Sequence, residues 1–147
     1  MRKEFHTNSL HHFKLIIYFN INSLINMNIE FLREYCLKKP EAAESFPFGE
    51  DTLVFKVAGK IFLLAGLDEV PLRINLKCDP EKAIELREQY EAVIPGYHMN
   101  KNHWNTVIID GTIPHRELLE WIDDSYLLIV NSLKKTDKKR INKLLRD

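Results

Sequence analysis

Residues 52–77 restrict the fold of this chain more than any other stretch, because they contain three strand-like runs separated by very short connections. The first two runs, TLVFKV (52–57) and KIFLLAGL (60–67), are joined only by Ala58-Gly59, which is typical of a tight hairpin. Strands joined in this way are antiparallel neighbours. The chain is therefore expected to contain an antiparallel sheet.

The third run, PLRINLK (71–77), indicates which face of that sheet is buried. Its apolar and polar side chains alternate, and a period of two is typical of a strand with one buried face. Lys56 alternates in the same way with the apolar residues of the first strand. The apolar side chains of the third run are Leu72, Ile74 and Leu76, and the polar ones are Arg73, Asn75 and Lys77.

Helical patterns flank the strands. NIEFLREYCLKK (28–39) has apolar residues on one face, and Asn28 is in position to cap it. CDPEKAIELREQY (78–90) begins with Asp79 as the expected cap. A longer helix with an apolar stripe is expected from near Pro114.

A further strand, WNTVIID (104–110), follows the second helix. The order along the chain is therefore helix, three strands, helix, one or two strands, helix. This order and the short connections predict an α+β fold of two layers. The mainly antiparallel sheet would carry its helices on one face and leave the other face uncovered.

Charge divides the chain into three parts, although the formal net charge is zero. Residues 27–133, the expected folded domain, carry 11 basic and 18 acidic side chains, whereas the basic C-terminal tail, residues 134–147, carries seven basic and two acidic ones. Residues 1–26 precede the first well-patterned helix, so we interpret them as a loosely attached extension or a start codon assigned too early. A functional anchor is the alternative. The acidic domain argues against binding nucleic acid over its whole surface.

The two cysteines, Cys36 and Cys78, lie in different segments, so no disulfide framework is expected. A reducing cytoplasm is the natural compartment for such a chain. The apolar stretch FKLIIYFNINSLI (13–25) is shorter than the ~20 residues of a membrane span and lacks a signal-peptide cleavage site. No membrane association is expected.

The polar stretch PGYHMNKNHWNT (95–106) contains the main candidates for chemistry. Its histidines, His98 and His103, match neither the helical HxxxH spacing nor a CxxC zinc motif, so no metal site is expected. The chain also lacks the glycine-rich loops that bind phosphates or dinucleotides, so no cofactor is expected. A catalytic pair of Cys78 with one of these histidines stays open as an alternative, but Asp79 opposes a thiolate there. We expect no enzymatic activity.

Binding is better supported by the residue types than catalysis. The polar face of the strands offers cations that can contact phosphates, and the 95–106 stretch adds flat rings that can stack on bases. We predict a nucleic-acid-binding set formed by Lys56, Arg73, Asn75, Lys77, Tyr97, Asn100, Lys101, His103 and Trp104.

Four motifs carry a family resemblance. In order and spacing they resemble the MmcQ/YjbR family of small bacterial proteins, and the likeness extends from about Met27 to Leu133. The motifs are FPFG (46–49), the VFKV–GK hairpin (54–60), INLKCDP (74–80) and PGYHMNKNHWNTV (95–107).

The resemblance implies a five-stranded sheet similar to frataxin-like and secretion-chaperone-like domains. It places the fourth strand at Gly96–Asn100 and puts Lys101-Asn102 in the turn that leads to the fifth. The family is commonly labelled DNA-binding because its sheet resembles the double-wing module of a phage transcription factor, which is an inference from fold. The family motifs fall on Asn75, Lys77, Tyr97, His98, Asn100, Lys101, His103 and Trp104.

The sequence thus favours a cytoplasmic, non-enzymatic protein that binds DNA weakly and in a salt-dependent way. A module that binds a protein or a small ligand, by analogy with chaperones of similar fold, is the main alternative.

Overall fold

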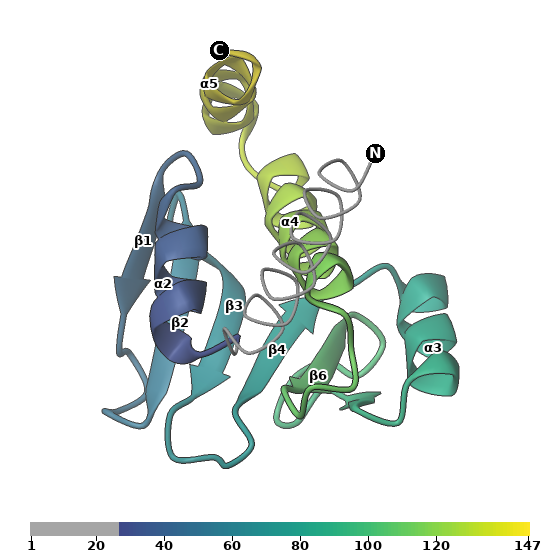
Figure 1. The fold of residues 1–147 in the computed structure, drawn as a ribbon. Coiled ribbons are helices and arrows are strands. Elements are labelled where there is room, and N and C mark those ends of the chain that lie inside the picture. The colour runs from purple at the N-terminus through teal and green to yellow at the C-terminus, as the bar shows by residue number, and fades with distance from the viewer. Residues whose placement is uncertain (1–26) are drawn as a thin grey trace, which may run out of the picture.

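The structure, a computed structural model, describes residues 27–147 (Figure 1). The elements are α2 (Ile29–Leu37), β1 (Ala42–Ser45), β2 (Thr52–Val57), β3 (Lys60–Gly66), β4 (Arg73–Lys77), α3 (Pro80–Gln89), β5 (Val93–Pro95), β6 (Trp104–Ile108), α4 (His115–Asn131) and α5 (Lys135–Arg146). The interpretation of residues 1–26 as an extension lies outside the described residues.

The strands form one antiparallel sheet in the order β1-β2-β3-β4-β6-β5, and α4 packs across β2, β3 and β4 (Figure 1). The helix α2 lies beside β1, and α3 lies against β5 and β6. The predicted α+β class and the antiparallel sheet are confirmed. The predicted number of strands, five, is wrong, because the described residues contain six.

The additional strand is β1, whose sequence AAES has little strand propensity. It pairs with β2 from Ala42 opposite Val57 to Ser45 opposite Val54. The carboxylate of Glu44 accepts hydrogen bonds from Nε and Nη2 of Arg33 in α2, at 2.7 and 2.5 Å. Pairing and packing therefore form this strand, and the residue pattern alone does not predict it.

The fourth strand implied by the family resemblance is also in a different place. The strand β5 ends at Pro95, and Gly96–Asn100 belong to the turn instead. His98 has a left-handed φ of 57°, which a strand does not accommodate. The backbone oxygen of Asn100 accepts hydrogen bonds from the N–H groups of His103 and Trp104, at 3.1 and 2.9 Å, and so closes the turn.

The helix starts agree with the sequence pattern. Asn28 caps α2, with its Oδ1 accepting the N–H of Phe31 at 2.9 Å, and Asp79 caps α3 through the N–H of Glu81 at 3.1 Å. These bonds satisfy backbone donors that a helix start leaves unpaired. The helix α4 directs a buried stripe at the sheet, formed by Leu118, Trp121, Ile122, Ser125, Tyr126, Ile129 and Val130.

The residues expected as a basic C-terminal tail form a helix of 12 residues, α5. Its Ile141 is fully buried, and Arg140 binds both carboxylate oxygens of Glu41 at 2.8 Å. Glu41 directly precedes β1. The helix α5 is therefore fixed at the end of the sheet where β1 begins.

Candidate nucleic-acid interface

The helices α2, α3 and α4 lie on one side of the sheet, and we call the opposite side the uncovered face. The alternation of β4 places Arg73, Asn75 and Lys77 on this face, because Ile74 and Leu76 point into the core. The strand register then aligns the side chains of the uncovered face in three rows across the strands. The first row combines two pairs, Lys56 with Ile61 and Lys77 with Trp104, and the irregularity in β3 leaves Ile61 and Lys77 without a direct pairing. The middle row holds Val54, Leu64, Asn75 and Thr106; the third row holds Thr52, Gly66, Arg73 and Ile108.

The first row, together with the turn that contains Lys101 and His103, forms what we call the basic end. Lys56 and Lys77 are separated only by β3, or about 10 Å across the sheet. The N–H of Cys78 donates to the backbone oxygen of His103 at 2.7 Å, so the turn lies beside the end of β4. None of the ion pairs found within residues 27–147 includes Lys56, Lys77 or Lys101.

Ser125 of α4 fixes the backbone at Lys77. The strand β3 is irregular beside Lys56, and Phe62 has no partner in the pairing of β2 with β3 or of β3 with β4. The Oγ of Ser125 donates to the backbone oxygen of Phe62 at 2.6 Å and accepts the N–H of Lys77 at 2.9 Å. The sequence analysis missed Ser125, because a single serine in an apolar helical stripe does not reveal its hydrogen-bond partners.

Arg73 does not belong to the basic end. It lies four residues, or about 13 Å, from Lys77 along β4. Its Nε is 2.9 Å from Oε2 of Glu69. Asp51 and Asp68 are also near this end of the strands, and a hydrogen bond from one carboxyl to the other raises the pKa of Asp68. The predicted set of cations is therefore divided between a basic end and an acidic one.

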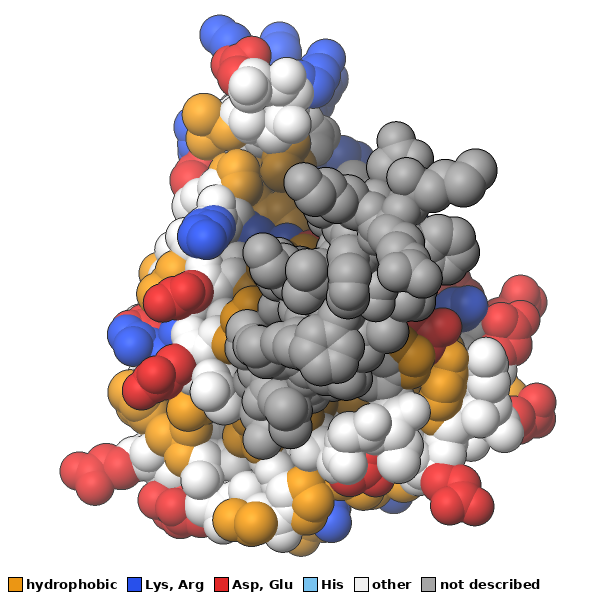
Figure 2. Space-filling view, viewed as in Figure 1, with side chains coloured by type: hydrophobic (Ala, Val, Ile, Leu, Met, Phe, Trp, Pro, Cys, Tyr) orange, Lys and Arg blue, Asp and Glu red, His pale blue; other side chains and the backbone are white. Residues whose placement is uncertain are grey.

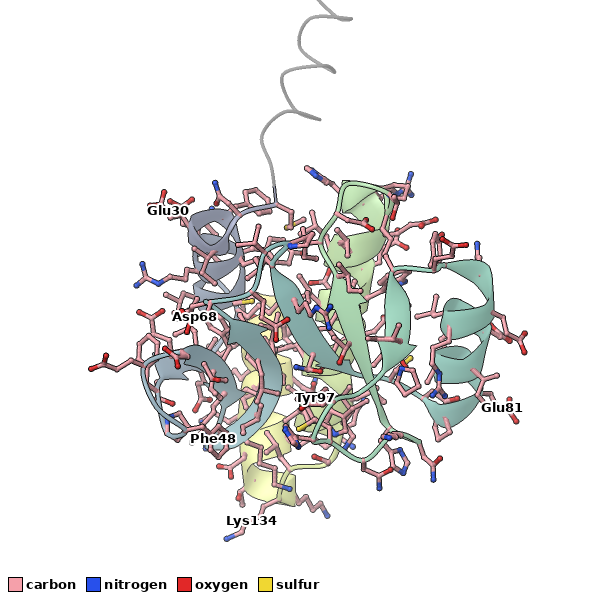
Figure 3. The ribbon with its side chains drawn as sticks, turned by 90° about the horizontal axis from the view of Figure 1, so that it is seen from below. Glu30, Phe48, Asp68, Glu81, Tyr97 and Lys134 are labelled. Carbon is pink, nitrogen blue, oxygen red and sulfur yellow. The ribbon has the colours of Figure 1, made fainter. Side chains whose placement is uncertain are left out.

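The side chains of the 96–103 turn serve different purposes. Asn100 holds the turn together, since its Oδ1 accepts the N–H of Asn102 at 3.0 Å. Trp104 is half-buried, whereas Tyr97 is 69% exposed and its ring lies 4.0 Å from that of His98 between centroids. Tyr97 is on the side of the sheet away from Glu30 of α2 (Figure 3). Of the two predicted stacking residues, Tyr97 is the more accessible.

The middle row contains a chain of hydrogen bonds that links two strands, β4 and β6, to the turn. The N–H of Tyr97 donates to Oγ1 of Thr106 at 3.1 Å, and this hydroxyl donates to Oδ1 of Asn75 at 2.5 Å. A hollow of about 240 Å³ lies here, lined by Gly66, Glu69, Arg73, Asn75, Tyr97 and Thr106. The sequence analysis named Arg73, Asn75 and Tyr97 among these residues. It missed Gly66, Glu69 and Thr106, because the strand register is needed to place them on this face.

The uncovered face is not uniformly open to solvent. Val54 and Thr106 in its middle row are 0% and 2% exposed, and Leu64 is 7% exposed. Contact with a partner at this face is therefore restricted to the two ends and the hollow between them.

Lys60 does not join the basic end. Its Nζ donates to the backbone oxygen of Ser132 at 3.2 Å, at the end of α4 on the helix side of the sheet. Lys60 pairs with Val57, whose side chain is buried in the core, so the Lys60 side chain lies on the helix side of the sheet.

The alternative catalytic pair is not favoured by the environment of Cys78. Burial, and then the adjacent Asp79 carboxylate, raise the pKa of the Cys78 thiol to about 11. The thiol is therefore protonated at neutral pH and is a poor nucleophile. Within residues 27–147, no three His, Cys, Asp or Glu side chains gather closely enough to hold a metal ion.

The fold and this face define a small α+β protein whose antiparallel sheet, within residues 27–147, has its helices α2, α3 and α4 on one side. A family model named YjbR matches residues 37–128. The chain belongs to the YjbR family, which confirms the resemblance carried by its four motifs.

Relatives and solved structures agree with this assignment. Escherichia coli O157:H7 YbdF, described as uncharacterized, is 42% identical over 113 residues, which cover 76% of this chain and 92% of the relative. Escherichia coli K12 YjbR, also uncharacterized, is 35% identical and covers 80% of this chain and 100% of the relative. The crystal structure of Deinococcus radiodurans protein DR2400 superposes with a TM-score of 0.74 at 40% identity, over 78% of this chain and 88% of that one.

Proposed function

We propose that this protein binds nucleic acid weakly, through the basic end of its uncovered face. The main observation in support is the row that contains Lys56, Lys77 and Trp104, beside the turn that holds Lys101. Lysines without acidic partners are available to phosphates, and phosphate contacts provide most of the affinity of non-specific binding. Tyr97 adds an exposed ring that can stack on a base.

The position of α5 supports the same proposal. Arg140 joins α5 to Glu41, next to Ala42, and Ala42 pairs with Val57 beside Lys56. In the space-filling view, Lys and Arg side chains gather on α5, whereas Asp and Glu side chains line the opposite margin (Figure 2). The helix therefore adds positive charge at the end of the molecule where we place the nucleic acid.

The proposal describes a non-enzymatic, cytoplasmic protein whose binding unit is residues 27–133 with the basic tail 134–147. The high pKa of Cys78 and the two unpaired cysteines support these features. No helix within residues 27–147 is long and apolar enough to span a membrane.

Fluorescence anisotropy with a labelled DNA duplex at low ionic strength tests the proposal. Lys77→Glu combined with Lys101→Glu is expected to weaken binding by tenfold or more, because two phosphate contacts become repulsive. Arg116→Glu is the charge control and should have little effect, because exposed Arg116 lies at the start of α4, whereas the end of α4 is the one that contacts Lys60. No binding at low salt, or equal binding by the double variant, would overturn the proposal.

A second candidate function, binding of a small ligand, is favoured by the hollow lined by Tyr97, which is concave and polar. Under this alternative, small molecules would bind at the hollow while oligonucleotides would not bind at all.

A further inference from the structure

The hollow on the uncovered face has the size of a single ring system. Its volume of about 240 Å³ is below the ~300–1,000 Å³ of sites for drug-sized ligands. It lies within the middle and third rows, between Tyr97 of the turn and Gly66 of β3. One heterocyclic ring with short substituents would fill it, whereas a whole dinucleotide would not fit.

The polar groups of the hollow are arranged mainly to donate hydrogen bonds. The hydroxyl of Thr106 already accepts the N–H of Tyr97 and donates to Oδ1 of Asn75. Because Oδ1 of Asn75 is engaged in this way, its amide nitrogen is the group left to donate. No hydrogen bond found among residues 27–147 uses that nitrogen. The ring of Tyr97 supplies a flat apolar wall.

The charge of the hollow favours an uncharged ligand over an anion. Arg73 and Glu69 pair at 2.9 Å and neutralise one another. The guanidinium can still donate through its terminal nitrogens, and the carboxylate can still accept. A ring that bears both acceptors and donors on its edge matches this pair, and nucleobases have such edges.

We propose that the hollow binds a single nucleobase, presented by single-stranded nucleic acid and stacked on Tyr97. This inference rests on the proposed function, because the strand's phosphates would be held at the basic end. Asn75 lies two residues before Lys77 on the same face, about 7 Å along β4. A strand bound at Lys77 therefore passes beside the hollow. A base within a duplex is stacked on its neighbours and would have to be extruded to enter.

Gly66 offers a direct way to close the hollow. A Cβ atom built on Gly66 would meet only the side chain of Glu69, with Cγ at 3.4 Å. Its backbone is not in the left-handed region, and valine is favoured in strands. The substitution Gly66→Val therefore fills the hollow without straining β3, and it leaves Lys56, Lys77 and Lys101 in place.

The test compares a fluorescein-labelled single strand of mixed sequence with its duplex, by anisotropy at low salt. The wild type should bind the single strand more tightly than the duplex. Gly66→Val and Asn75→Leu should each weaken single-strand binding by about tenfold, since a stacked base contributes ~1–3 kcal/mol. Gly66→Val should leave duplex binding unchanged. Thermal unfolding identifies any variant that fails to fold, and Gly66→Val is the decisive one because it removes no hydrogen bond.

The outcomes separate this inference from the proposed function. If both nucleic acids bind and Gly66→Val changes neither affinity, the hollow does not hold a base, while the basic-end proposal stands. Deoxynucleosides, titrated alone and followed by the NMR signal of the Asn75 side-chain amide, supply the second readout. A second outcome is that the nucleosides shift the Asn75 signal in the wild type but not in Gly66→Val, while no oligonucleotide binds. This outcome would support base binding in the hollow and overturn the proposed function. If neither binds, both proposals are overturned.

Discussion

Ser125 joins the helix layer to the backbone of the proposed interface. Its hydroxyl satisfies two backbone groups, the oxygen of Phe62 and the N–H of Lys77, that the irregular strand β3 leaves without a strand partner. It is also fully buried. Water therefore does not replace the hydroxyl when it is removed.

We expect Ser125→Ala to lower the free energy of unfolding by ~1–3 kcal/mol, the cost of leaving buried hydrogen-bonding groups unpaired. Urea denaturation measures this change. Ser132→Ala is the control, because within residues 27–147 the Ser132 hydroxyl bonds only the Ile129 oxygen, at the exposed end of α4. Removing this hydroxyl should change stability by about 0.5 kcal/mol or less. Equal effects of the two substitutions would show that Ser125 does not have the bridging role.

Cys78 provides a prediction on pH. Its pKa of about 11 means that the thiol is protonated at neutral pH and that the reactive thiolate forms only as the pH approaches 11. The rate of alkylation by iodoacetamide should therefore be slower at pH 7 than that of a free cysteine peptide, and should keep rising above pH 9. Cys36 is fully buried and should react only on unfolding. An alkylation rate at pH 7 faster than that of the peptide would support the alternative in which Cys78 is a catalytic nucleophile.

At the scale of elements, the hairpin of β5 and β6 depends on a close approach at Gly96. A Cβ atom at this position would lie 2.8 Å from the backbone oxygen of Trp104 and 2.9 Å from its Cβ. These atoms belong to a paired strand and cannot move aside easily. The same approach positions the turn that carries Tyr97 and Lys101.

Gly96→Ala should therefore destabilise the protein by ~1–3 kcal/mol, as overpacking does. It should also weaken nucleic-acid binding, because the turn is displaced. Gly66→Ala is the matched control, since the added methyl meets only the Glu69 side chain. The melting temperatures of the two variants are the measurement, and similar values would contradict the account of this hairpin.

The elements differ in how far the sequence predicts them. The periodic apolar face predicts β4 and α4, and for α2 and α3 the capping residues Asn28 and Asp79 also mark the start. The strand β1 and the short strand β5 could not be predicted, because pairing with neighbours forms them and their residues have no strand pattern. The same limit applies to α5, whose helical length follows from packing of Ile141 as well as from local propensity.

The candidate site could likewise be predicted from the sequence only in part. Alternation predicts that Arg73, Asn75 and Lys77 share a face, since β4 is regular. It does not predict that Arg73 pairs with Glu69 from the loop before β4, or that Thr106 bonds Asn75 from β6. These contacts depend on strand order and on loop paths, which local sequence does not determine.

For the whole molecule, the arrangement of charge matters more than its sum. The acidic residues 27–133 and the basic residues 134–147 cancel in net charge, yet α5 is fixed at the same end of the sheet as Lys56. Three lysines of the basic end predict about three phosphate contacts. A plot of log affinity against log salt should therefore have a slope of about −3.

Lys101→Gln should reduce that slope by about one, because it removes one phosphate contact without adding a negative charge. Arg116→Gln, at the start of α4, is the control and should leave the slope unchanged. Duplex binding measured from low to moderate salt gives the slope for the wild type and for each variant. A slope near zero would indicate that phosphates are not bound.

NMR can locate where nucleic acid contacts the protein, which we place at the basic end of the uncovered face. A titration of the ¹⁵N-labelled protein with a short DNA at low salt reports which backbone amides change. We predict the largest shifts at Lys56, Lys77 and the turn from Tyr97 to Trp104, with little change in α2. Shifts confined to the helix side, or none at all, would contradict the account.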